Sequence, residues 1–242
     1  MATVTQSPDR RSIRVWDLPL RLFHWALVAA IAVALLSAEE GSPLNDLHVM
    51  AGWTVGVLVV FRLVWGFVGG EHSRFADFVR PSRIGHHIAG LAGKRREASL
   101  GHNPMGAIAV IALLALAGAT VWTGAFGSGE DLHEVLGWTM LALVGVHIVA
   151  VIVMSRIERE NLVRAMVTGR KPADRHPGAA DATRPGVFAL VLGIAVIAGT
   201  IFAIVQYDPQ AFTQRSAEAF EHRGDAAPER AYREEREERD DD

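Results

Sequence analysis

The chain contains no cysteine among its 242 residues. This absence excludes disulfide bonds, cysteine-bound iron–sulfur clusters and the C-x-x-C-H attachment of c-type haem. Any haem must therefore be held non-covalently, and any other metal must be bound by histidine, methionine, carboxylate or carbonyl groups. The formal net charge of -3 says little about partners, because the charged residues are segregated along the chain.

Hydrophobic residues make up 50% of the chain, and they fall in long runs instead of being spread as in a soluble core. A run of about 20 apolar residues is long enough to cross the hydrocarbon core of a bilayer as a helix. The sequence therefore predicts an all-α, integral membrane helical bundle. The five expected spans cover residues 20–37, 46–68, 104–124, 131–154 and 186–206.

Lysine and arginine are missing from two of the connecting segments, 38–45 and 125–130. Arginines are frequent before the first span, in the segment that follows the second and in the segment that follows the fourth. With five spans, all three basic segments lie on one side, which the positive-inside rule assigns to the cytoplasm. We therefore expect a multi-pass protein of the cytoplasmic (inner) membrane, with a cytoplasmic N-terminus and a periplasmic C-terminus.

Four of the ten histidines lie in or at the ends of the expected spans: His24, His48, His133 and His147. In this topology His48 and His133 lie near the outer surface, whereas His24 and His147 lie near the inner surface. The two histidines of the fourth span are 14 residues apart, which is roughly 21 Å along a helix and nearly the same helix face. The sequence therefore predicts two pairs of facing histidines, His48 with His133 and His24 with His147.

Two imidazoles that face each other from different helices suit the axial ligation of a haem used for electron transfer. Gly52, Gly56 and Gly137 follow the outer histidines at helical spacing, and they would let a flat macrocycle approach the backbone. Small residues at such spacing also serve ordinary helix packing in membranes. Four unrelated polar residues that bridge helices are the alternative to ligation, but intramembrane ionisable groups are usually functional.

Two arginines are candidate cations for haem propionates. Arg62 lies 14 residues after His48, on the same helix face and at the depth of the inner pair. Snorkelling to the inner headgroups is the alternative for Arg62. Arg21 lies at a similar depth in the first span.

The first span, 20–37, also resembles a secretory signal peptide, because arginines precede it and Leu36-Ser37-Ala38 ends it. Cleavage would remove His24. We therefore expect the span to be retained.

Several short motifs follow one another in a fixed order. They are Arg14-Val15-Trp16-Asp17, Arg21-Leu22-Phe23-His24-Trp25, His48-x3-Gly52-Trp53, Arg62-Leu63-Val64-Trp65-Gly66, Gly101-His102-Asn103-Pro104-x-Gly106, Thr123-Gly124, and His133-Glu134 with His147. As an ordered set over about residues 12–155, they resemble the bacterial cytochrome b-561 and nickel–iron hydrogenase b-type cytochrome family.

The resemblance implies a four-helix core that binds two haem b groups, with His24, His48, His133 and His147 as axial ligands to the haem iron. It also implies quinone chemistry in the membrane subunit of a respiratory redox complex. In the related formate dehydrogenase membrane subunits, a turn before the third helix lies near the quinone. Asn103 and Gly106 fall at a comparable place. The fifth helix and the charged tail depart from the simplest four-helix members.

We therefore divide the chain into five parts. They are a cytoplasmic N-terminal segment (1–19), a four-helix dihaem cytochrome b core (20–154), a basic cytoplasmic loop (155–185), a fifth C-terminal transmembrane helix (186–206) and a charged periplasmic tail (207–242). The tail carries twelve acidic residues and six arginines. This composition is typical of a solvated, flexible segment, and a docking arm for a basic partner is the alternative.

The leading hypothesis is a dihaem b-type cytochrome that transfers electrons across the cytoplasmic membrane between a periplasmic redox partner and the quinone pool. The partner could be a hydrogenase, a dehydrogenase or a cytochrome c, and a homodimer stays open; no nucleic-acid partner is expected. One alternative is a self-sufficient superoxide:quinone-type oxidoreductase. The other is a metal or proton transporter that uses the histidines, although the spans lack the chain of acidic residues that proton relays often use.

Overall fold

The computed structural model describes residues 12–39, 44–78, 100–101, 104–127 and 129–213. Five of its helices are long and apolar enough to cross a membrane, which confirms the predicted helical bundle. They are α1 (Leu18–Leu36), α2 (Asn45–Val68), α5 (Pro104–Phe126), α6 (Glu130–Ile157) and α8 (Val187–Tyr207). The ends lie within three residues of the expected ones.

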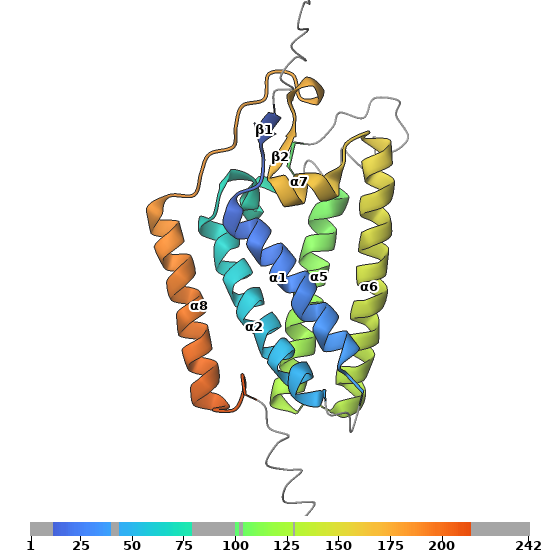
Figure 1. Ribbon diagram of the computed structural model, residues 1–242, viewed down its shortest axis with the longest axis vertical. Helices are drawn as coiled ribbons and strands as arrows, with labels where there is room; N and C mark the ends of the chain where they lie inside the picture. Colours follow the sequence, from blue (N-terminus) through green and yellow to red (C-terminus); the bar gives the residue numbers. More distant parts are fainter. Residues whose placement is uncertain (1–11, 40–43, 79–99, 102–103, 128, 214–242) are drawn as a thin grey trace, which may run out of the picture.

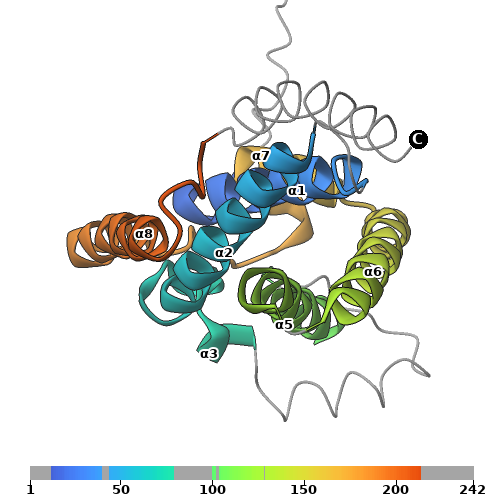
Figure 2. The same cartoon turned by 90° about the horizontal axis from the view of Figure 1, so that it is seen from below.

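Helix α2 lies at the centre of the bundle. It packs against α1, α5 and α8, and α5 in turn packs against α6 (Figure 1, Figure 2). The buried side of α2 presents Val55, Val59, Phe61 and Trp65 to its neighbours. These large apolar side chains recur at helical spacing, so one stripe of α2 supplies much of the core.

Helix α6 is far less covered by protein than α2. In the most apolar stretch of α6, only 6% of the residues are buried inside the protein, whereas the corresponding share for α2 is 33%. Its main neighbours are α5 and the short helix α7 (Leu162–Thr168) rather than α1 or α2. Since α6 carries both His133 and His147, these side chains lie on the least buried of the five spans.

The small elements gather at one end of the bundle, which we call the basic face (Figure 1). They are β1 (Ser12–Arg14), η1 (Glu71–Ser73), α3 (Phe75–Phe78), α7, β2 (Arg170–Pro172) and η2 (Ala173–Arg175). Strands β1 and β2 pair antiparallel, with Ile13 opposite Lys171. The segment 155–185 is therefore folded, whereas the sequence indicated a plain basic loop.

Asp17 joins the start of α1 to the end of α2. One of its carboxylate oxygens accepts hydrogen bonds from Leu20 N at 2.8 Å, which caps α1, and from Trp65 Nε1 at 3.3 Å. The other accepts from Gly70 N at 3.1 Å and from Ser73 Oγ at 2.5 Å. A single carboxylate thus fixes the relative position of two spans at the basic face.

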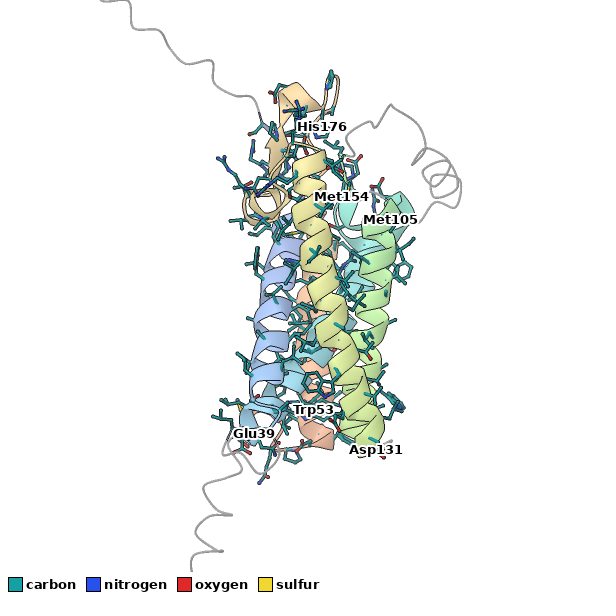
Figure 3. The ribbon with its side chains drawn as sticks, turned by 90° about the vertical axis from the view of Figure 1, so that its right-hand side faces the viewer. Glu39, Trp53, Met105, Asp131, Met154 and His176 are labelled. Carbon is teal, nitrogen blue, oxygen red and sulfur yellow. The ribbon has the colours of Figure 1, made fainter. Side chains whose placement is uncertain are left out.

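The opposite face is marked by Glu39, Trp53 and Asp131, which Figure 3 places at the far end of the bundle from Met105, Met154 and His176. Here the end of α8 is tied to α2, because Trp53 Nε1 donates to Asp208 Oδ2 at 3.2 Å. The Trp53 ring also packs edge-on against Tyr207. The fifth helix is therefore anchored to the bundle at this face.

Candidate functional site

The structure brings His48 of α2 and His133 of α6 together near the opposite face. Their ring centroids are 5.9 Å apart, and the ring planes are nearly perpendicular, at 86°. A metal–imidazole bond is about 2 Å long, so two rings that share one metal have centroids roughly 6 Å apart. The separation of this outer pair suits an ion bound between the two rings.

Main-chain carbonyls orient both rings of the outer pair. His48 Nδ1 lies 2.8 Å from the carbonyl oxygen of Ala34 in α1, and His133 Nδ1 lies 3.0 Å from that of Thr120 in α5. Because a carbonyl oxygen only accepts, each Nδ1 must carry the proton. Each Nε2 is then left with its lone pair, which is the tautomer that a metal ligand needs.

Neighbouring glycines leave room beside the outer pair. A Cβ added at Gly52 or at Gly137, one helical turn after each histidine, would meet no atom within 4 Å. A Cβ at Gly124 would instead lie 2.7 Å from Cε1 of His133, so the absence of a side chain at Gly124 makes room for the His133 ring. Gly56 differs, because it packs closely against a side chain of α5. No protein atom of the described residues therefore lies close to the position of a side chain at Gly52 or Gly137.

His24 of α1 and His147 of α6 form the inner pair. Both side chains are half-buried, and the two imidazoles lie close enough to interact electrostatically. The His24 ring also packs edge-on against Trp25, with centroids 5.3 Å apart. Neither inner ring is hydrogen-bonded to a described residue, so the outer pair is the more firmly oriented of the two.

The two candidate propionate partners have different surroundings. Arg62 is only 2% exposed and lies over the ring of Phe75 at 4.7 Å, so it does not reach the headgroups by snorkelling. Its Nη1 has no hydrogen-bond partner among the described residues. Arg21 instead donates from Nε to the carbonyl of Met166 at 3.3 Å and from Nη2 to that of Val167, at the end of α7.

The expected quinone residues are only partly visible. Asn103 lies outside the described residues. Gly106 is half-buried in the first turn of α5, at the basic face. Within the described part of the chain, no three histidine or acidic side chains are grouped so that they could hold a metal ion.

Sequence reasoning missed the groups that hold the outer rings. The carbonyls of Ala34 and Thr120 belong to the main chain, so no pattern of side chains in the sequence indicates that they bind the two rings. The Thr123-Gly124 motif was noted without a role. The structure places the Thr123 hydroxyl 3.3 Å from His133 Nδ1, beside the glycine that admits the ring.

Comparison with known proteins finds relatives over most of the bundle. The family model described as prokaryotic cytochrome b561 matches residues 15–169. A protein from Bradyrhizobium diazoefficiens named Probable Ni/Fe-hydrogenase B-type cytochrome subunit is 22% identical, over 70% of this chain and 90% of its own length. One of the same name from Rhizobium leguminosarum is 24% identical, over 67% and 90%.

An Escherichia coli protein named Probable Ni/Fe-hydrogenase 1 B-type cytochrome subunit is 26% identical, over 46% of this chain and 57% of its own length. No solved structure matches the chain. The family match covers more than half of the chain and agrees with the spans and motifs described above. The chain therefore belongs to the prokaryotic cytochrome b561 family and is a multi-pass membrane b-type cytochrome of electron transfer.

Proposed function

We propose that the chain holds two haem b groups and moves electrons across the inner membrane between a periplasmic redox partner and the quinone pool. The observation that carries this proposal is the outer pair, in which the ring centroids of His48 and His133 lie 5.9 Å apart and both Nδ1 atoms are hydrogen-bonded to carbonyls. The inner pair, His24 and His147, would hold the second haem.

The residues of the chain bind and orient, while the haem supplies the one-electron change of its iron. His48 and His133 bind through Nε2. The carbonyls of Ala34 and Thr120 hold the rings and raise the basicity of Nε2. The inner pair lies roughly 21 Å from the outer pair along α6, because 14 residues separate the two histidines of that helix. Two haem sites at this spacing would provide a path for electrons from one side of the membrane to the other.

Arg62 is the proposed cation for a propionate of the inner haem. A charged guanidinium inside a membrane span is costly unless an anion or several acceptors surround it. Arg62 is buried, and its Nη1 has no partner among the described residues. Asn103 and Gly106 remain the proposed quinone contacts, and Gly106 lies in the first turn of α5 at the basic face.

The proposed orientation puts the basic face in the cytoplasm, where positively charged segments are retained. The outer pair then lies next to the periplasm. A nickel–iron hydrogenase is the partner that the names of the relatives suggest. Hydrogen-dependent reduction of the cytochrome in membranes that contain such a hydrogenase would support this partner. Quinone reduction by the purified chain alone, with superoxide as the donor, would contradict the need for one.

The first test is a reduced-minus-oxidised absorption spectrum of the purified protein with a pyridine haemochrome assay. We expect a b-type spectrum and two haems per chain. One haem per chain would contradict one of the two histidine pairs. A colourless protein, made with ample haem and gently solubilised, would overturn the proposal and favour a histidine-based transporter.

Replacing Gly124 with alanine should weaken binding of the outer haem. The new Cβ would lie 2.7 Å from Cε1 of His133, so the ring must move off its carbonyl partner. Losing such an orienting contact typically lowers metal affinity by roughly 10- to 100-fold. The measurements are haem content per chain and the redox midpoint potential of each haem.

The matched control for this variant is Gly118→Ala on the same helix. A Cβ there would meet its nearest neighbour, a Val59 methyl group, at an ordinary 3.9 Å. The control should keep both haems and both potentials. If Gly124→Ala also keeps them unchanged, the close approach of Gly124 to the His133 ring is not needed for haem binding.

A further inference from the structure

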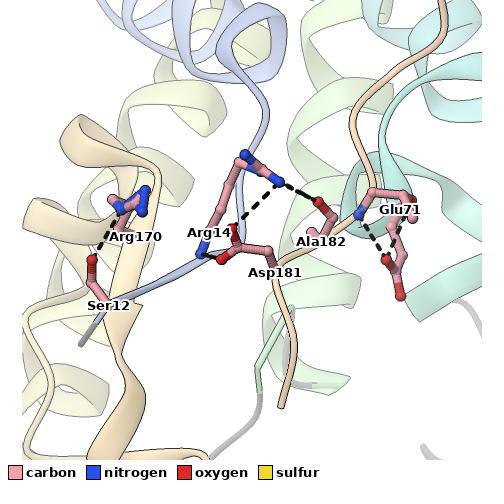
Figure 4. Close-up of polar contacts among 7 residues, drawn as sticks. Ser12, Arg14, Glu71, Arg170, Asp181 and Ala182 are labelled. Atoms are coloured by element: carbon pink, nitrogen blue, oxygen red, sulfur yellow. Dashed lines mark hydrogen bonds and ion pairs between the residues drawn. The ribbon is translucent and has the colours of Figure 1, made fainter.

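A pocket of about 470 Å³ opens at the basic face, away from the histidine pairs. Its walls come from β1 and the start of α1, from β2, and from the segment that leads into α8. Figure 4 shows part of this wall, where Arg14 reaches Asp181 and Ala182 while Arg170 lies beside Ser12. Four arginines line the pocket: Arg14, Arg21, Arg170 and Arg184.

The lining is positively charged overall. Its two carboxylates are already engaged, because Asp17 holds α1 to α2 and Glu71 accepts from the backbone N–H of Thr183 at 3.0 Å. A third acid, Asp181, lies beside the pocket. The hydrogen bond from the Arg14 backbone N–H lowers its pKa, and nearby guanidinium groups, including that of Arg184, lower it further.

Two of the four arginines are tied to the protein through their guanidinium groups. That of Arg14 donates to the carbonyl of Ala182, and that of Arg21 donates to the end of α7. Among the described residues, the Arg170 guanidinium donates only from Nε, to Ser12 Oγ at 3.0 Å. Arg184 makes no hydrogen bond or ion pair with any described residue. Arg170 and Arg184 can therefore both bind an added anion.

The pocket is also continuous with apolar membrane surface. Leu18, in the first turn of α1, and Leu190, in the first turn of α8, line it and are exposed. Leu22 and Ile194, about one turn deeper on the same two spans, are exposed as well, at 63% and 69%. A ligand with a charged head and an apolar tail would satisfy both parts of this surface.

We propose that this pocket binds the phosphate headgroup of an anionic phospholipid, with its acyl chains against α1 and α8. Basic pockets between membrane helices on the cytoplasmic side are suited to such headgroups, because arginine forks match phosphate oxygens and the leaflet is anionic. Free phosphate offers the same head chemistry but would leave Leu18 and Leu190 without a partner. The inference rests on the proposed orientation and is independent of haem ligation.

The test is native mass spectrometry of the full-length protein in detergent. The probes are phosphatidylglycerol, phosphatidylcholine with the same acyl chains, and inorganic phosphate as a competitor. The variants are Arg184→Gln and the double variant R170Q/R184Q. Arg164→Gln is the matched control, because it removes the same charge from an exposed position of α7 outside the pocket. Bound haem is read from the same spectra, so failure of the haem proposal is seen separately.

We expect phosphatidylglycerol to remain bound to the wild type and to Arg164→Gln, and phosphatidylcholine to be lost. Each arginine near an anionic lipid is worth about a fivefold change in binding, so Arg184→Gln should lose roughly fivefold and the double variant roughly 25-fold. Equal losses in Arg164→Gln would show unspecific attraction and overturn the site. If inorganic phosphate fully displaced phosphatidylglycerol, the pocket would be a site for free anions, and the proposal of a bound phospholipid would be wrong.

Discussion

Replacing His147 with alanine should lower the haem content from two per chain to one. In the proposed function, His147 of α6 and His24 of α1 hold the inner haem together, so neither histidine should retain it alone. The outer pair lies roughly 21 Å away along α6 and is held by its own carbonyl contacts, so it should survive. The haemochrome assay gives the count, and a redox titration shows which potential has disappeared.

The complementary variant, His133→Ala, should remove the other haem, and the double variant should remove both. Val146→Ala, an exposed neighbour of His147 on α6, is the control and should keep two haems. A His147→Ala protein that retains both haems would exclude the proposed pairing. Loss of the same haem in both single variants would contradict the assignment of His133 and His147 to separate haems, because the two side chains lie roughly 21 Å apart along α6.

The spans and the facing of the outer histidines could be predicted because both follow from local rules. Helix rise and the alternation of loops place His48 and His133 at one depth without knowledge of any tertiary contact. The structure does bring these two rings together, at 5.9 Å. The orientation of the rings could not be predicted. Every residue has a main-chain carbonyl, so the sequence does not mark those of Ala34 and Thr120 as hydrogen-bond partners.

The basic face could be predicted least well. Segment 155–185 was expected to be a basic cytoplasmic loop, and nothing in its sequence indicated that Lys171 and His176 are buried. Strand β2 pairs with β1 across more than 150 residues, and no local pattern encodes such a contact. The contact of the Arg21 guanidinium with the carbonyls at the end of α7 was likewise not indicated by the depth of Arg21 in the first span.

Charge pairing accounts for the burial of this segment. Glu160 Oε2 lies 3.3 Å from Lys171 Nζ, and Glu160 Oε1 lies 2.8 Å from His176 Nε2. The three side chains are 2%, 3% and 4% exposed. Charges removed from water to this extent are tolerated only when they are paired, so we expect the contact between Glu160 and Lys171 to stabilise α7, β2 and η2, which together we call the cap of the basic face.

Glu160→Gln should therefore destabilise the cap strongly. The substitution keeps the shape of the side chain but removes the negative charge that lies beside the buried Lys171 ammonium, and breaking a buried pair in this way typically costs about 3–5 kcal/mol. The effect should be confined to α7, β2 and η2, because the membrane helices keep their own packing. Hydrogen–deuterium exchange of residues 162–176 measures the local opening, and the haem spectrum should stay unchanged.

Two further variants separate charge loss from a general disturbance. Glu158→Gln removes a half-buried carboxylate outside the cluster, so its exchange should match the wild type to within about 0.5 kcal/mol. Glu160→Gln combined with Lys171→Met removes both charges and should recover part of the protection, since replacing a whole buried pair with uncharged groups is often neutral. If Glu160→Gln exchanges no faster than Glu158→Gln, the cap is held by its backbone contacts, and the buried carboxylate contributes little.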